Sequence, residues 1–135
     1  MINLLVDANI DGHGDLLDQR LQTDKWKEVR DHLDIRVLNF ESVGLARTAK
    51  DAFVWAFCQE HGYYLLTANR NEESEDSLQA TIRREGTALS LPVFTFADAK
   101  RIHRSAAYLD EVVGRLLEYL LDKERYNGAG RLYLP

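Results

Sequence analysis

The chain has 135 residues, of which 45% are hydrophobic and 29% charged, and its formal net charge is −5. This length suits one domain with a sizeable core, and the composition excludes a disordered chain. The acidic balance argues against a protein that coats nucleic acid non-specifically, since phosphate neutralisation drives that kind of affinity. It is compatible with an enzyme that touches a few phosphates through metal ions and a local basic patch.

The sequence also argues against membrane and secretory classes. No window approaches the roughly 20 apolar residues of a membrane-spanning helix, and the N-terminal residues lack the basic region of a signal peptide. Cys58 is the only cysteine, so an internal disulfide is excluded. It lies in an apolar run, which favours a buried small side chain over a nucleophile. These features predict a cytoplasmic protein with no membrane association.

The first half of the chain alternates between strand and helix patterns. Residues 2–6 form a short apolar run typical of a buried strand, and residues 14–33 carry two helical patterns in succession. Residues 35–40 predict a second strand. Residues 48–61 predict a helix, with Gly62 just past its end.

The second half continues this alternation. Residues 63–67 are β-prone and predict a third strand, and a helix is expected over 74–85. Residues 92–96 predict a fourth strand, whose proline is tolerated at the first position. The clearest element is a helix over 106–122, because its apolar side chains recur without a break at helical spacing. The tail over 126–135 is expected to be irregular or weakly extended.

Strands that alternate with helices imply crossover connections and a mainly parallel sheet with both faces covered. The prediction is therefore an α/β fold, a three-layer α/β/α sandwich whose sheet has four to five strands. We expect a single domain over 1–135. Its core would span about 2–96, and 97–135 would form a helical extension and tail.

Polar residues follow the predicted strands where each strand ends. Ligands of open parallel sheets bind beyond the carboxyl ends of the strands, so we expect these segments to meet at one edge. The segments supply Asp7 and Asn9, then Asp51 at a helix start, then Thr67, Asn69, Arg70, Asn71 and Asp76. Hard divalent cations such as Mg²⁺ and Mn²⁺ take oxygen ligands of these types. Such ions can activate water and stabilise the leaving oxygen of a phosphodiester.

Each of these residues also has a structural explanation. Asp51 could complete an acidic capping box, and Asp76 suits the first turn of a helix. Asn69 and Asn71 could be loop residues that tolerate left-handed conformations. Asp7 is the strongest functional candidate, because a carboxylate directly after a buried strand needs a partner or a metal.

Three short stretches, residues 4–9, 48–53 and 64–71, resemble the PIN-like family of small bacterial proteins. Many members of that branch are predicted ribonucleases or toxin-like partners in toxin–antitoxin pairs. The resemblance covers about 2–96, and it places Asp7 and Asp51 on the first two metal-binding acids of the family. Where the family commonly has acids in a Thr-x-Asp-Arg-Asp pattern, this chain has amides instead. An amide brings no negative charge, so metal affinity should fall.

The resemblance implies an endoribonuclease that depends on Mg²⁺ or Mn²⁺, acting as the toxin of a toxin–antitoxin pair. The expected catalytic acids are Asp7, Asp51 and Asp76, the expected further metal ligands are Asn69 and Asn71, and the expected substrate contacts are Asn9, Thr67 and Arg70. The predicted partners are RNA and an antitoxin or regulatory protein. The alternative is a catalytically weak or inactive PIN-like module that binds nucleic acid or protein.

Two further features have both a structural and a functional interpretation. Basic residues gather over 100–104 and again at Arg83 and Arg84, and they form either a solvated helix face or a phosphate-binding patch. The apolar tail over 132–134 follows a Gly-rich connector and is expected to fray unless it docks. Docking on a second subunit predicts a homodimer, and docking on its own domain is the alternative.

Overall fold

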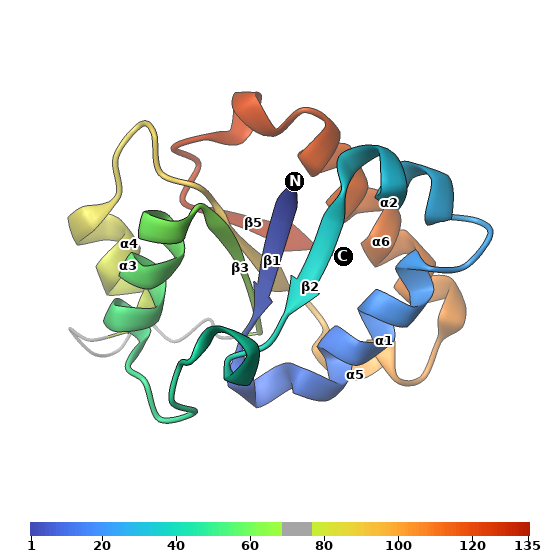
Figure 1. Cartoon of the computed structure of the whole chain (residues 1–135), viewed down its shortest axis with the longest axis horizontal. Helices are drawn as coiled ribbons and strands as arrows, with labels where there is room; N and C mark the ends of the chain where they lie inside the picture. The colour runs from blue at the N-terminus through green and yellow to red at the C-terminus, as the bar shows by residue number, and fades with distance from the viewer. Residues whose placement is uncertain (69–76) are drawn as a thin grey trace.

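The computed structural model describes residues 1–68 and 77–135, and these residues form one sheet in which every strand pair is parallel. The order across the sheet is β2-β1-β3-β4-β5. The strands are β1 Ile2–Val6, β2 Ile35–Leu38, β3 Tyr63–Thr67, β4 Val93–Phe96 and β5 Arg131–Leu134. Helices cover both faces (Figure 1), so the predicted α/β class and three-layer sandwich are confirmed.

The helices divide unequally between the two faces of the sheet (Figure 1). One face carries α1 Asp11–Leu21, α2 Lys27–Leu33, α5 Ala99–Ile102 and α6 Ala106–Leu121, and the other carries α3 Asp51–His61 and α4 Leu78–Glu85. Short 3-10 turns occur at η1 Ala8–Ile10, η2 Glu41–Val43 and η3 Lys123–Tyr126. Among the helices of the described residues, none has the length and apolar character needed to cross a membrane.

Side-chain alternation in β1 explains why the sheet is buried on both faces. Leu4 packs into the core beneath α1 and α6, Leu5 packs into the core beneath α3, and both are 0% exposed. A strand buried on both faces has a continuous apolar sequence, which is the pattern of residues 2–6.

The predicted helix over 106–122 is α6, and its N-cap Ser105 accepts a hydrogen bond from the Tyr108 amide at 3.1 Å.

Two predicted helix starts differ from the structure. The helix expected over 48–61 begins at Asp51, because Lys50 is extended and serves as the N-cap without a side-chain hydrogen bond. The capping-box interpretation of Asp51 is therefore wrong. The helix expected over 74–85 is described from Leu78 onward. Ser77 is its N-cap and accepts a hydrogen bond from the Ala80 amide at 3.1 Å.

The tail, expected to be irregular or weakly extended, contains the strand β5 and is thus extended over Arg131–Leu134. β5 pairs with β4 over four register partners, and Leu134 is 0% exposed in the same core as Leu4. Gly128 turns the chain before this strand with a φ of +82°, where a side chain would meet the Ala88 carbonyl oxygen at 2.8 Å. The tail thus docks on its own sheet. It no longer supports the predicted homodimer, which stays a prediction.

Candidate functional site

The carboxyl edge of the sheet presents Asp7 immediately after β1. The Asp7 amide still donates to the Leu66 carbonyl oxygen at 2.9 Å, so the backbone at Asp7 continues the ladder. Thr67, the last residue of β3, donates its hydroxyl hydrogen to Asp7 Oδ2 at 2.7 Å. Thr67 is 0% exposed. It therefore supports the Asp7 carboxylate from beneath. The sequence predicts instead that Thr67 contacts substrate at the surface.

Asp51 reaches the same edge from the start of α3. Arg47, in the loop before α3, contacts Asp11 Oδ2 at 2.6 Å and donates to the Ala8 carbonyl oxygen at 2.8 Å. These contacts fasten the loop to the segment that follows β1. Asp51 Oδ2 accepts a hydrogen bond from the Leu78 amide at 3.2 Å, which links it to α4. The negative charge of Asp51 raises the pKa of Asp7, so the two carboxylates interact electrostatically.

The pKa of Asp7 lies above its ordinary value, and burial is the main cause. The charge of Asp51 adds to the shift. Hydrogen bonds from the Thr67 hydroxyl and from the backbone amides of Asn9 and Ala8 favour the charged form. They do not cancel the upward shift of the pKa. Among the described residues, no lysine or arginine forms an ion pair with Asp7. Within the described part of the chain, the Asp7 carboxylate therefore lacks the compensation that a nearby lysine or arginine would provide.

The buried thiol of Cys58 is inert. Cys58 is 1% exposed, and burial together with the charge of Asp7 raises its pKa to about 12. At neutral pH it stays protonated, whereas a nucleophilic cysteine needs the thiolate. The cysteine is therefore part of the core beneath the acidic pair and is unsuited to nucleophilic catalysis.

The other predicted site residues divide into two groups. Asn9 is exposed on η1, directly beyond Asp7. The remaining ones lie outside the described residues: Asn69, Arg70, Asn71 and Asp76. Within the described residues, no group of three His, Cys, Asp or Glu side chains is placed to hold a metal ion. The described part of the site thus supplies the acidic pair, its supports and one exposed amide.

A row of polar side chains that the sequence pattern did not reveal continues from Asp7 across the sheet. Thr95 of β4 is the register partner of Thr67, and both are 0% exposed on the face covered by α3 and α4. Arg131 of β5 donates from Nη1 to Thr95 Oγ1 at 2.7 Å and from Nε to Gln79 Oε1 at 2.9 Å. The sequence signal for this row is the order Phe94, Thr95, Phe96. Because neighbouring side chains of a strand point to opposite faces, the Thr95 hydroxyl lies on one face and the two core aromatic rings lie on the other.

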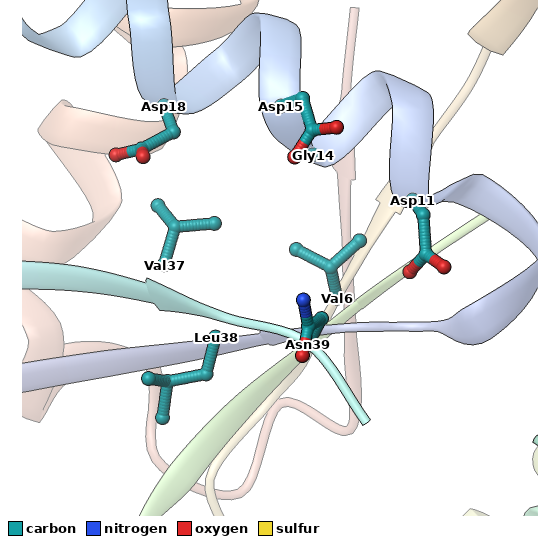
Figure 2. A pocket seen from close by; sticks show the side chains of 8 residues that line it. All are labelled: Val6, Asp11, Gly14, Asp15, Asp18, Val37, Leu38 and Asn39. Carbon is teal, nitrogen blue, oxygen red and sulfur yellow. The ribbon is translucent and has the colours of Figure 1, made fainter. Parts of the chain in front are cut away.

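A cavity of about 230 Å³ lies between α1 and the strands β1 and β2 (Figure 2). Figure 2 shows Asp11, Asp15 and Asp18 along α1, on one side of the cavity, with valines of the strands opposite them. Gly14 permits the close approach of α1, because a Cβ there would lie 2.7 Å from Val6 Cγ1. Of the predicted site residues that the structure describes, none lines this cavity. It is a feature distinct from the acidic pair.

Comparisons of the chain with models of known protein families, with curated proteins and with solved structures find no significant match. The resemblance to PIN-like proteins rests on the three sequence stretches. The parallel three-layer architecture is consistent with such a fold.

Proposed function

We propose that this chain is an endoribonuclease of PIN-like type that depends on Mg²⁺ or Mn²⁺, with the acidic pair Asp7 and Asp51 at its centre. The observation that carries the proposal is a partly buried carboxylate with a raised pKa beside a second carboxylate at the ligand-binding edge of a parallel sheet. Burying charge is costly unless an opposite charge or a metal compensates it. The oxygen donor set fits a hard divalent cation.

The chemistry that such a cation supplies is activation of water and stabilisation of the leaving oxygen of a phosphodiester. Asp7 and Asp51 would hold the ion. The Thr67 hydroxyl orients the Asp7 carboxylate and the Leu78 amide orients the Asp51 carboxylate, so both acids are positioned before any ligand binds. Asn9 lies on the solvent side of Asp7, where an RNA phosphate would approach.

The residues after β3 complete the proposal. Asp76 would be the third acid, Asn69 and Asn71 would position the ion, water or phosphate, and Arg70 would bind a substrate phosphate. The resemblance favours a cytoplasmic toxin that is held in check by an antitoxin.

A second candidate is a binding or regulatory module without catalytic activity. The observation that favours it is that both acids already accept hydrogen bonds inside the protein, Asp7 from Thr67 and Asp51 from Leu78. These bonds compete with a metal for the same oxygen atoms. The amides at positions 69 and 71 supply no extra negative charge to overcome this competition.

Cleavage of a labelled RNA by the purified protein, with Mn²⁺ and with a chelator, tests the proposal. We expect cleavage that the chelator stops and that Asp51→Asn nearly abolishes. The matched control is Asp122→Asn, because Asp122 is an exposed aspartate at the end of α6, away from this edge. Cleavage that survives both the chelator and Asp51→Asn would refute the assignment.

Calorimetry with Mn²⁺ separates the two candidates. The nuclease requires saturable Mn²⁺ binding that Asp51→Asn weakens and Asp122→Asn leaves unchanged. A folded protein that binds no Mn²⁺ at millimolar concentration favours the binding module.

A further inference from the structure

The segment that follows β4 carries three cations at the edge of the sheet where the acidic pair lies. Lys100 and Arg101 belong to α5, Arg104 follows it, and all three are exposed. Among the described residues, none of the three lies within 4.0 Å of a carboxylate oxygen. In a chain of net charge −5 this is a local concentration of positive charge available to a ligand.

Contacts with the core hold this segment in place. The Arg101 guanidinium lies over the Tyr108 ring, 4.6 Å from its centroid, and Tyr108 is only 3% exposed. The His103 ring meets the His13 ring of α1 edge-on, with centroids 4.3 Å apart. α1 begins shortly after Asp7, so α5 is anchored close to the segment that carries Asp7 (Figure 1). Because Arg101 is held in this way, it loses less conformational entropy when it binds a phosphate.

An exposed aromatic side chain lies on the opposite flank of the same edge. Phe53 is 60% exposed in the first turn of α3, two residues after Asp51. The next residues of that turn, Val54 and Trp55, face the core, so Phe53 projects outward. Lys50, the N-cap of α3, is also exposed. The acidic pair therefore has an aromatic and basic flank on α3 and a basic flank on α5.

We propose that an RNA strand crosses the carboxyl edge of the sheet between α3 and α5, with phosphates on Lys100, Arg101 and Arg104 and an unpaired base stacked on Phe53. Basic grooves combined with aromatic platforms are the means by which proteins bind single-stranded nucleic acid. A base inside a duplex is already stacked, so Phe53 favours an unpaired strand. The inference rests on the proposed action on RNA, and it requires no catalysis.

Fluorescence anisotropy with a short labelled single-stranded RNA in chelator tests the basic flank. The test variant is K100A/R101A/R104A. The control is K27A/K123A/R125A, which removes three exposed cations from the opposite edge, where α2 and η3 lie (Figure 1). Each lost phosphate contact on a single strand lowers the slope of log Kobs against log salt by about 0.7.

We expect the test variant to lower that slope by about 2 and the affinity by about tenfold or more, while the control keeps the parent slope. Equal losses in the two variants would mean that only net charge matters, and the proposal would fall. Wild-type protein that binds no RNA would also overturn it. Binding without any metal-dependent cleavage would overturn the proposed chemistry alone.

Phe53→Ala tests the aromatic flank, with Leu121→Ala as the control, since Leu121 is a similarly exposed apolar residue, 57% exposed, at the end of α6. We expect Phe53→Ala to weaken single-stranded RNA binding by about tenfold, to leave duplex binding unchanged, and to be rescued by Phe53→Trp. Unchanged binding of single-stranded RNA by Phe53→Ala would overturn the stacking role and point to a protein contact. An equal loss on duplex RNA would overturn the preference for an unpaired strand.

Discussion

Two aspartates show how differently this fold treats a carboxylate. Asp110, on α6, accepts hydrogen bonds from Arg20 Nε and Nη2 at 2.7 and 2.6 Å and from Trp26 Nε1 at 2.9 Å. These donors hold the pKa of Asp110 well below its usual range. Asp7 has the Thr67 hydroxyl and nearby amides but no cation among the described residues, and burial raises its pKa.

The difference separates a structural acid, Asp110, from the acid proposed to be functional, Asp7. Asp110 joins α6 to α1 and to the segment before α2, and its charged form stabilises the folded state. Asp7 destabilises the folded state when charged, although Thr67 partly offsets this. Proteins retain such unfavourable groups mainly at functional sites, where perturbed pKa values cluster. This contrast is a stronger argument for function at Asp7 than its residue type alone.

The largest expected effect comes from Asp7→Asn. The amide oxygen can still accept from Thr67, but the negative charge is gone, so we expect nearly all metal-dependent cleavage to disappear. Because the charged form of Asp7 is unfavourable in the folded state, the same change should raise the Tm at neutral pH. Thermal unfolding and RNA cleavage, measured on one preparation, check both halves. A variant that loses activity and also loses stability would contradict this account.

Asp110→Asn should have the opposite outcome. It loses the charge that binds the Arg20 guanidinium at a side chain only 17% exposed, so the free energy of unfolding should fall by about 2 kcal/mol. Cleavage measured below the Tm should be retained. Urea denaturation gives the free energy. Asp122→Asn is the control, because its pair with Arg125 is exposed at 3.6 Å and its loss should cost less than about 1 kcal/mol.

Binding of a divalent metal should make the charge of Asp7 compensated, as the charge of Asp110 already is. Mn²⁺ would compensate the charge of Asp7 as Arg20 compensates that of Asp110. At ten times its Kd it should stabilise the folded wild type by about 1.4 kcal/mol. The Asp7→Asn variant should show little or no such shift, whereas Asp110→Asn should show the full shift. Thermal melts with and without Mn²⁺ measure this, and an equal rise in Asp7→Asn would place the metal elsewhere.

The smallest effects are two opposite pH dependences. The ordinary aspartate pKa is 3.8, and the folded-state value is higher for Asp7 and lower for Asp110. Wild type should therefore lose stability relative to Asp7→Asn as pH rises from about 3.8 through the raised value. The free energy of unfolding of wild type should exceed that of Asp110→Asn by the full amount above about pH 3.8. This difference should shrink as the pH falls toward the lowered pKa of Asp110. Unfolding free energies over the acid range test the signs.

Much of this architecture could be predicted from local sequence pattern. The runs at 2–6 and 63–67 are continuous and apolar, as strands buried on both faces must be. β5 was not predicted as a strand, because its apolar pattern is short and only half-buried. Leu132 and Leu134 face the core while Tyr133 is 48% exposed, and this pattern identifies a strand only once its pairing with β4 is known. α5 has four residues, too few to show a helical period.

The site was predictable in position but less so in its contacts. The rule that ligands bind beyond the carboxyl ends of parallel strands predicts that Asp7 and Asp51 lie at one edge. The partnership of Thr67 with Asp7 depends on strand register, and the brace from Arg47 to Asp11 joins segments far apart in the chain. Neither follows from any short stretch of residues.

The all-parallel sheet has a kinetic consequence. Every pair of neighbouring strands is joined through at least one intervening helix, and no hairpin exists among the described strands. Even the nearest register partners, such as Leu66 and Phe94, must close a long loop before they gain a contact. Folding of such topologies is slow, on the order of milliseconds to seconds, and strand edges stay open to other chains meanwhile. The edge at which Thr67 contacts Asp7 therefore forms only after the strands β1 and β3 have paired.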